Sequence, residues 1–399
     1  MDVKTGPEDF ALLGGKPLFD SIRSTSNLVR PDFAKFLLYS RQLFEDNVYS
    51  GEGRVEQLLD ARLADFHQVR HCISLCSGFW ALVLGMQCLA LKGRTEAVIP
   101  SLTYRRLADA VAWAGLTPHF CEVDPVRLCM TAETARPCIT ENTALILGVH
   151  PLVNCCDAEG LEALSAESGI PLLFDSVEAA YEVLNGRKIG SFGRAECFSM
   201  HASKLLNAFE GGYVTTDEDA LAHNLRAMRN YGVGVEGASL APAMNAKQNE
   251  IHAAMALAAL DDVDEQVERN RQRYYRYQRG LASVPGVRLV QYDERQRSGF
   301  KNIVVELLDD WPISRELTLA LMHEDNLLCR PYYSPLHEKA AGYATVRGDL
   351  SRTEALARRF VTLPCGYFVS EDDVGLVCEY LRTIHIHAIA LAQRASKGS

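Results

Sequence analysis

The chain has 399 residues, of which 48% are hydrophobic and 23% are charged, and both fractions are ordinary for a globular protein. This composition excludes collagen-like, low-complexity and disordered classes, and the length predicts two or three domains. The net charge of −10 argues against binding to nucleic acid or to anionic membranes through overall charge. The start of the chain lacks the pattern of a signal peptide, and apolar runs such as residues 143–149 are too short to span a bilayer. We therefore expect a cytoplasmic protein with no nucleic-acid and no membrane partner.

The first part of the chain predicts an arm followed by helices. Residues 1–30 show no clear periodicity and are expected to form an N-terminal arm. Apolar residues at helical spacing predict helices over residues 33–44 and 55–66, with a polar turn at residues 49–53 between them.

From residue 71 onward, short apolar runs alternate with helical patterns. The runs, read as buried strands, are residues 71–75, 97–99, 118–123, 144–149, 172–175, 197–200 and 212–215. The helical patterns are residues 81–90, 107–114, 158–167 and 219–228. This alternation predicts an α/β domain with a mainly parallel seven-stranded sheet between helices. The last two strands are close together in sequence and could include an antiparallel member.

After residue 250 the pattern changes to a mixture of helices and strands. A long helix is expected over residues 250–280, with further helices at 314–325 and 371–385 and strands at 287–290, 302–307 and 327–330. We therefore divide the chain into the arm (1–30), a large domain (31–250) and a small C-terminal α+β domain (251–399) that begins with the long linking helix.

Histidine and cysteine residues cluster at His67, His71, Cys72 and Cys76. These residues straddle a predicted helix end and a strand, and the second ligand pair of a structural zinc site is missing. The twelve cysteines form no C-x-x-C pair and mostly lie in apolar runs, where a free Cys behaves as a small hydrophobe. We predict neither a metal site nor disulfides.

Polar residues follow several predicted strands, at the edge where α/β sheets bind ligands. Ser77 and Gly78 lie between a strand and a helix whose N-terminus suits a phosphate. Tyr104 follows the next strand, Asp175 ends another, and Lys204 has mainly uncharged neighbours. Each residue alone has a plain alternative, namely a turn, a packed ring, a helix N-cap and a solvated lysine.

Together these residues supply what pyridoxal 5′-phosphate (PLP) requires. A lysine in a partly apolar pocket can have its pKa lowered, and it can then act as a nucleophile and hold the cofactor as a Schiff base. A carboxylate keeps the pyridine nitrogen protonated, an aromatic ring covers one face, and a helix N-terminus binds the phosphate.

The chain resembles the DegT/StrS-type nucleotide-sugar aminotransferases, which are fold-type-I PLP enzymes, from about Leu28 to about Ile384. The motifs occur in the family's order: Cys76-Ser77-Gly78, residues 99–104, Phe174-Asp175, residues 198–204, Glu210-Gly211-Gly212, residues 244–250 and residues 330–337. The resemblance implies the fold of aspartate aminotransferase, with a large PLP-binding domain and a smaller C-terminal domain.

The resemblance also implies roles for individual residues. It gives catalytic roles to Lys204 and Asp175. It implies cofactor contacts from Ser77, Gly78, Phe79, Tyr104, Asp175, Glu178, Ser199, Lys204, Asn245 and Lys247. It implies substrate contacts from Arg330, Tyr332, Tyr333 and His337. The loop that carries Asn245 and Lys247 resembles one that reaches the partner subunit's cofactor, so a homodimer with active sites between subunits is expected.

The expected activity is transfer of an amino group from an amino acid, with glutamate as the expected donor, to a nucleotide-linked keto-sugar in amino-sugar or natural-product biosynthesis. Pyridoxamine phosphate would be the intermediate form of the cofactor. One alternative within the family is amination of a free keto-cyclitol or another non-nucleotide ketone. An alternative of another class is a non-catalytic sensor or scaffold with this fold. A sugar dehydratase of the same fold carries His in place of the lysine, and Lys204 argues against that reading.

Three departures from the family pattern bear on the site. Phe79 replaces a Thr, Arg105 and Arg106 follow the stacking aromatic, and Glu178 replaces a Gln or His. If Glu178 lies beside the cofactor's phenolic oxygen, like charges disfavour joint ionisation and the two groups would share one proton. The alternative is that Glu178 turns toward Arg105, Arg106 or solvent.

Overall fold

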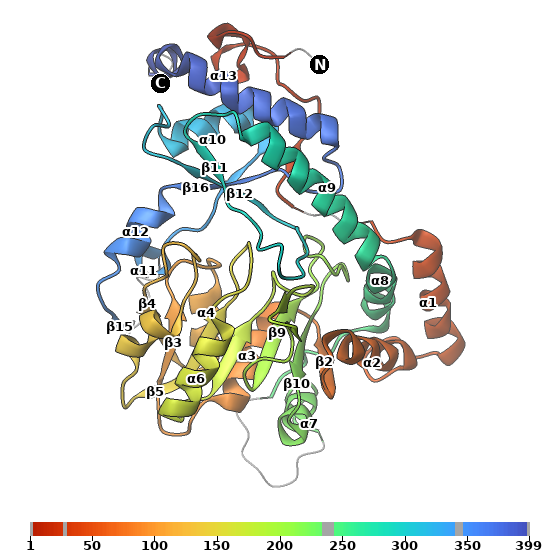
Figure 1. Cartoon of the computed structure of the whole chain (residues 1–399). Coiled ribbons are helices and arrows are strands. Elements are labelled where there is room, and N and C mark those ends of the chain that lie inside the picture. Colours follow the sequence, from red (N-terminus) through yellow and green to blue (C-terminus); the bar gives the residue numbers. More distant parts are fainter. Residues whose placement is uncertain (1–2, 27–29, 234–242, 340–345, 397–399) are drawn as a thin grey trace.

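The computed structural model describes residues 3–26, 30–233, 243–339 and 346–396 (Figure 1). Leu28, where the family resemblance begins, lies outside these described residues. The larger of the two main sheets contains β2 (His71–Leu75), β3 (Glu96–Pro100), β4 (Thr117–Cys121), β5 (Thr143–Val149), β6 (Leu172–Asp175), β9 (Ala195–Ser199), β10 (Gly212–Thr216) and β15 (Val346–Arg347).

The strand order of this large sheet is β15-β4-β3-β5-β6-β9-β10-β2. Strand β10 is antiparallel to both of its neighbours, and the other pairs are parallel, which confirms the mainly parallel sheet. The sheet has eight strands rather than the expected seven, because β15 from the C-terminal part of the chain pairs with β4 at the edge. A strand of two residues is too short to leave a hydrophobic pattern in the sequence.

Helices cover both faces of the large sheet, as expected for a parallel arrangement. One face packs against α3 (Gly78–Leu89), α4 (Leu107–Trp113) and α7 (Asp219–Met228). The other face packs against α2 (Arg54–His67), α6 (Ala158–Ser168) and α8 (Glu250–Asp261). All seven residues of the central strand β5 are buried, so both of its faces contribute to the core.

The predicted helix over residues 250–280 is two helices, because the chain bends at Asp262 between α8 and α9 (Val263–Leu281). The Asp262 carboxylate accepts the Asp32 N–H at 3.0 Å and pairs with Lys35, both at the start of α1 (Phe33–Asp46). Helix α8 therefore packs with α1 and α2, whereas α9 continues to the small sheet (Figure 1).

The small sheet contains β11 (Val287–Leu289), β12 (Ile303–Leu307), β16 (Phe360–Leu363) and β14 (Arg330–Pro331), in that antiparallel order. It packs with α9, α10 (Arg315–Glu324) and α13 (Glu371–Ala395). Further short elements are α5 (Ala132–Ala135), α11 (Leu336–Lys339), α12 (Ser351–Ala357), β7 (Val183–Leu184), β8 (Arg187–Lys188) and 3-10 helices at Pro7–Asp9, Ala11–Leu13 and Arg136–Cys138.

The N-terminal arm packs on the core of the small sheet. Phe10 and Phe19 are fully buried there, and β1 (Arg23–Ser24) pairs in parallel with β13 (Leu327–Leu328). The Lys4 ammonium pairs with the buried Asp325 carboxylate at 2.7 Å. The expected boundaries at residues 30 and 250 stay predictions.

Helix α13 is long and apolar enough to cross a membrane by length and composition alone. Half of its most apolar window is buried against the rest of the protein. Its buried residues, which include Tyr380 and Leu381, belong to the core of the small sheet, and core helices of this kind meet the same criterion.

Candidate active site

The strand ends that carry the predicted site residues share one edge of the large sheet. Strands β3, β6 and β9 are parallel, and β2 runs in the same direction because β10 is antiparallel to both β2 and β9. The C-terminal ends of these strands therefore bring Ser77, Tyr104, Asp175 and Ser199 to the same edge.

Ser77 and Gly78 form a tight turn into α3. The Ser77 hydroxyl caps the helix by accepting the Trp80 N–H at 3.3 Å. A Cβ added to Gly78 would lie 2.7 Å from the Ser199 Cβ, and one added to Gly212 would lie 2.4 Å from the Gly78 nitrogen. The absence of side chains at both glycines thus allows Ser199 to lie beside the first turn of α3.

Asp175 is the last residue of β6 and is 1% exposed. Its carboxylate accepts a hydrogen bond from the Val177 N–H at 3.2 Å. Burial raises the pKa of Asp175 to about 6, although Lys204 acts in the opposite direction. No helix begins directly after β6 in the described chain, which argues against the helix-cap interpretation of this residue.

Lys204 lies in the turn that follows β9, where its backbone N–H donates to the His201 carbonyl at 2.8 Å. Its ammonium group pairs with one oxygen of Glu178, and the Lys301 ammonium pairs with the other oxygen. Asn302 also donates to that second oxygen, at 3.3 Å. The exposed fractions of the Lys204, Glu178 and Lys301 side chains are 19%, 9% and 8%.

The electrostatics of this cluster favour an ionised Glu178. Burial alone would raise the pKa of Glu178, but the two ammonium groups outweigh it and hold the pKa well below its usual range. Glu178 therefore faces Lys204 and Lys301, and the alternative in which it turns to Arg105 or Arg106 is wrong for this structure.

Lys301 and Asn302 were not predicted from the sequence. They directly precede the buried strand β12, and Phe300 lies on the other side. A lysine with uncharged neighbours at a strand end is the same signal that identified Lys204. Nothing in the local pattern indicates that this second lysine reaches the carboxylate that Lys204 contacts, because the contact joins the small sheet to the large one.

Two tyrosines complete this part of the site. Tyr104 is 46% exposed, which leaves its ring accessible. Tyr333 interacts electrostatically with Glu178, Asp175 and Tyr104, so it lies among them. Burial raises the pKa of Tyr333, which keeps its phenol protonated and able to donate a hydrogen bond.

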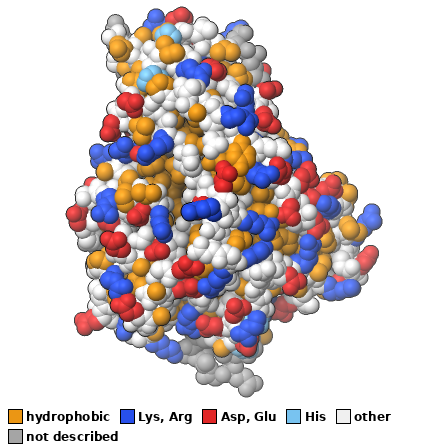
Figure 2. Space-filling model, in the orientation of Figure 1, with side chains coloured by type: hydrophobic (Ala, Val, Ile, Leu, Met, Phe, Trp, Pro, Cys, Tyr) orange, Lys and Arg blue, Asp and Glu red, His pale blue; other side chains and the backbone are white. Residues whose placement is uncertain are grey.

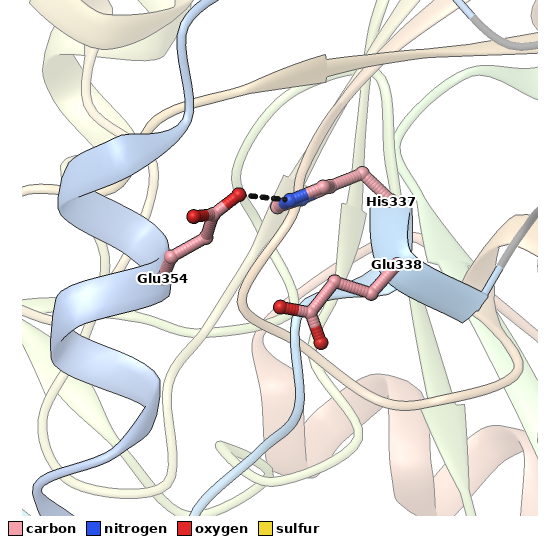
Figure 3. Close-up of side chains that lie close together, drawn as sticks. All are labelled: His337, Glu338 and Glu354. Carbon is pink, nitrogen blue, oxygen red and sulfur yellow. Dashed lines mark hydrogen bonds and ion pairs between the residues drawn. The ribbon is translucent and has the colours of Figure 1, made fainter.

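Two other predicted substrate residues are buried and already have partners. The Tyr332 hydroxyl accepts the Leu152 N–H at 3.3 Å. The Nδ1 atom of His337 lies 2.7 Å from the Ser101 hydroxyl. Its Nε2 atom lies 2.9 Å from the Glu354 carboxylate (Figure 3). Their contact with a substrate stays a prediction, as does that of the exposed Arg330 on β14.

Two histidine clusters can be compared with metal sites. His337, Glu338 and Glu354 offer ligand atoms within 4.8 Å of one another, but both ring nitrogens of His337 already have hydrogen-bond partners. His67 is buried, and its ring nitrogens lie 2.6 Å from the Ile189 carbonyl and 2.9 Å from the Tyr213 hydroxyl. These contacts direct its ring away from a shared ligand set with the nearby cysteines.

Asn245 and Lys247 are not brought to Lys204 within this chain. The Lys247 ammonium donates to the side-chain oxygens of Asn230, at 2.6 Å, and Asn245, at 3.1 Å. The intervening Ala246 carbonyl accepts the Cys76 N–H at 2.8 Å, so the loop passes beside the segment that leads to Ser77.

The residues at this edge fit PLP. A cationic lysine lies beside a buried carboxylate, Asp175, whose charge suits a protonated ring nitrogen. Ser77, Gly78 and Ser199 surround the N-terminus of α3, where a phosphate is favoured. Phe79 supplies no hydroxyl, so its contribution to a phosphate would come from its backbone N–H.

Comparison with known proteins gives a consistent result. The model of the DegT/DnrJ/EryC1/StrS aminotransferase family matches residues 34–382. A GDP-perosamine synthase from Vibrio cholerae is 24% identical over 86% of this chain and 94% of its own length. An L-glutamine:2-deoxy-scyllo-inosose aminotransferase from Micromonospora echinospora is 31% identical over 62% of each chain.

Solved structures agree in fold. The structure of DesI in the presence of its TDP-sugar product has a TM-score of 0.92 and 32% identity, and it covers 97% of this chain and 99% of that one. The aminotransferase TlmJ from Streptoalloteichus hindustanus has a TM-score of 0.81 at 24% identity, over 91% of this chain and 98% of its own.

Proposed function

The chain belongs to the DegT/DnrJ/EryC1/StrS aminotransferase family, and from this premise we propose that it holds PLP on Lys204 and aminates a keto-sugar. The observation that carries the proposal is the meeting of Lys204, Glu178 and the buried Asp175 at one edge of the sheet. A sensor or scaffold has no need of a buried carboxylate beside a lysine, so this geometry favours catalysis over the non-catalytic alternative.

PLP, when bound, supplies a ring that withdraws electrons from the carbon that bears the amino group. Asp175 holds a proton on the ring nitrogen through a charge-assisted hydrogen bond. Ser77, Ser199 and the first N–H groups of α3 bind the phosphate. The Lys204 amine, once free, would act as the general base and acid that takes the proton from the donor's α-carbon and returns it to the cofactor.

The expected acceptor is a nucleotide-linked keto-sugar, because DesI was solved with a TDP-sugar product and a relative is a GDP-perosamine synthase. A free keto-cyclitol is the second candidate, because the relative at 31% identity is a 2-deoxy-scyllo-inosose aminotransferase. Glutamate is the expected donor, and glutamine is tested beside it because that relative's name specifies L-glutamine.

An absorbance scan tests the proposal. The purified protein with PLP is mixed with glutamate or glutamine, and the band of the lysine-bound cofactor is expected to disappear as the pyridoxamine form appears. A spectrum that neither donor changes would support the scaffold. Panels of nucleotide keto-sugars and of free cyclitol ketones, followed by mass spectrometry, then distinguish the two acceptor classes.

A homodimer in the cytoplasm is part of the proposal. Helix α1 exposes Phe33, Leu38 and Phe44 at 69%, 65% and 67%, which is an unusual share of large apolar side chains for a free helix face. Elsewhere on the face seen in Figure 2, acidic and basic side chains are intermixed. A second copy that covers α1 could donate Asn245 and Lys247 to the site, and light scattering that shows a fully active monomer would contradict this.

A further inference from the structure

Lys301 has no role in the motifs that identify the family, yet it contacts the same carboxylate as Lys204. We propose that Lys301 and Glu178 act as one electrically neutral pair in place of the Gln or His that is usual at position 178, and that Lys301 is the positioning residue that keeps Glu178 ionised and directed at Lys204. The inference rests on the proposed function, because it concerns the charge beside the Lys204-bound cofactor.

The position of Lys301 is fixed by the residues around it. The Gly299 N–H donates to the buried Glu182 carboxylate at 3.2 Å, and Asn270 donates to the Gly299 carbonyl at 3.0 Å. On the other side, the Asn302 N–H donates to the Tyr292 hydroxyl at 3.0 Å. These bonds hold the segment ahead of β12 on both sides of Lys301, so its ammonium group is directed at Glu178 by the backbone.

The two oxygens of Glu178 have different partners, and this makes the carboxylate a bridge. One oxygen faces Lys204, which changes its bonding when the cofactor is held. The other faces Lys301 and Asn302, which belong to the segment before β12. We expect this segment to keep its position when the cofactor is held, because of the hydrogen bonds on both sides of Lys301. When Lys204 is occupied with the cofactor, Lys301 therefore remains as the counter-charge of Glu178.

Charge balance explains why the second lysine is needed. An ionised carboxylate in a buried site is costly without a cation. A Gln at position 178 would be neutral, whereas Glu178 alone would add a negative charge beside the cofactor's phenolic oxygen. The ammonium group of Lys301, whose side chain is 8% exposed, cancels that charge within the site.

Other ionisable groups also face this pair, and they must be the same in every variant for the test to be clear. They come from β6 and its following turn, from the segments around β11 and β14, and from the end of β16. They are Asp175, Glu182, Tyr292, Tyr332, Tyr333 and Cys365. Burial raises the pKa of the phenols and the thiol, so these groups stay neutral at ordinary pH. Burial also raises the pKa of Asp175 to about 6 and that of Glu182 to about 7, so both carboxylates titrate in the range of the test. Both are present in every variant, and each variant is therefore compared with the wild type over the same pH range.

The test is a pH titration of the absorbance of PLP bound to the full-length protein. Lys301→Met leaves Glu178 unpaired, so the cationic nitrogen that joins Lys204 to the cofactor should lose its proton at higher pH. Glu178→Gln leaves Lys301 unpaired, so the same nitrogen should lose its proton at lower pH. Each shift should be about one pKa unit or more, because opposite charges at this range favour and like charges disfavour the cation by that amount.

The double variant Glu178→Gln with Lys301→Met restores a neutral site and should titrate within a few tenths of a unit of the wild type. Lys301→Arg keeps the charge and should also titrate like the wild type. Lys188→Met is the matched control: Lys188 is partly buried, but its ammonium donates to the Phe66 carbonyl rather than to a carboxylate. Its titration should be unchanged.

Two results would overturn the proposal. One is a Lys301→Met variant that binds PLP and titrates like the wild type. The other is a pair of single variants whose shifts have the same sign and add up in the double variant. If Lys301→Met does not fold, the comparison of Glu178→Gln with the double variant still decides, because only a neutral pair predicts recovery in the double variant. A wild-type protein that forms no PLP absorbance band contradicts the proposed function instead.

Discussion

Two lysine–carboxylate clusters of this chain, Lys4 with Asp325 and Lys204 and Lys301 with Glu178, are used in different ways. Asp325 contacts Lys4 and also accepts the Leu18 N–H at 2.8 Å and the Tyr380 hydroxyl at 2.8 Å. Lys4 in turn donates to the Asp9 carbonyl at 2.5 Å. Every charge in this pair has several partners within the protein, and it joins the N-terminal arm to the small sheet.

The cluster of Lys204, Glu178 and Lys301 also consists of ammonium groups and a carboxylate, but its polar groups are less fully partnered within the protein. Lys204 is 19% exposed, against 4% for the Lys4 side chain, and the neighbouring Asp175 has a pKa that burial raises to about 6. A structural pair is satisfied on all sides, whereas a site for a ligand retains polar groups whose partners arrive with the ligand. This difference predicts that changes at the cluster affect chemistry and changes at Lys4 affect stability.

The largest effect is expected for Lys204→Ala. No other described side chain at this edge offers an amine in the same place, so cofactor attachment and transamination should be lost. The thermal unfolding temperature should change little, because the cluster contributes little to the core. Absorbance and single-turnover assays with glutamate measure the loss, and turnover near the wild-type rate would show that the lysine is wrongly assigned.

Asp175→Asn should give the second largest effect. The amide cannot hold the ring nitrogen protonated, so the half-reaction with the donor should slow by roughly a hundredfold or more, as when a charge-stabilising group is removed from other enzymes. PLP should still bind. Stopped-flow measurement of the donor half-reaction tests this, and unchanged kinetics would favour a purely structural role for the carboxylate.

Lys4→Met tests the structural side of the comparison. Removal of one partner leaves Asp325 as an unpaired buried charge, which costs about 3–5 kcal/mol of unfolding free energy. Urea unfolding measures the loss. The absorbance of bound PLP and the rate of the folded enzyme should not change, and a spectral change in this variant would mean that the two regions are coupled.

The smallest effect concerns pH and the protein without cofactor. Because burial raises the pKa of Asp175 from 3.8 to about 6, the folded state binds this proton more tightly than the unfolded state. The contribution of this group to the free energy of unfolding is therefore fully present below about pH 4. It falls as the pH rises from about 4 to about 6, by about 3 kcal/mol in total, and does not change further at higher pH. Unfolding of the wild type and of Asp175→Asn at several pH values isolates it, since Glu182 and Glu196 are common to both. Parallel pH profiles would contradict the raised pKa.

Much of the fold follows from the sequence, because the strands of the large sheet are apolar runs whose side chains are buried on both faces of the sheet. The pattern could not predict the bend at Asp262, since it depends on contacts with the start of α1. It also missed β16, although Phe360–Leu363 is fully buried, because four residues between polar segments give a weak signal.

The residues of the candidate active site likewise include some that the sequence could predict and some that it could not. Lys204 and Asp175 could be predicted because each ends or follows a strand of the same sheet, and the geometry of parallel strands brings them together. Lys301 could not, because it reaches Glu178 from the segment before β12, 123 positions further along the chain. Pairings of this kind are a property of the tertiary structure and leave no spacing in the sequence.

The docking of the arm on the small sheet has a consequence for biosynthesis. Leu18 donates to Asp325, which is 307 positions later in the chain. At about 5–20 residues per second, a ribosome needs roughly 15–60 s to make the intervening segment. During that time Phe10 and Phe19 have no core to enter. The arm is thus synthesised well before it can reach its final place, and the nascent arm is an expected binding site for chaperones that recognise apolar segments.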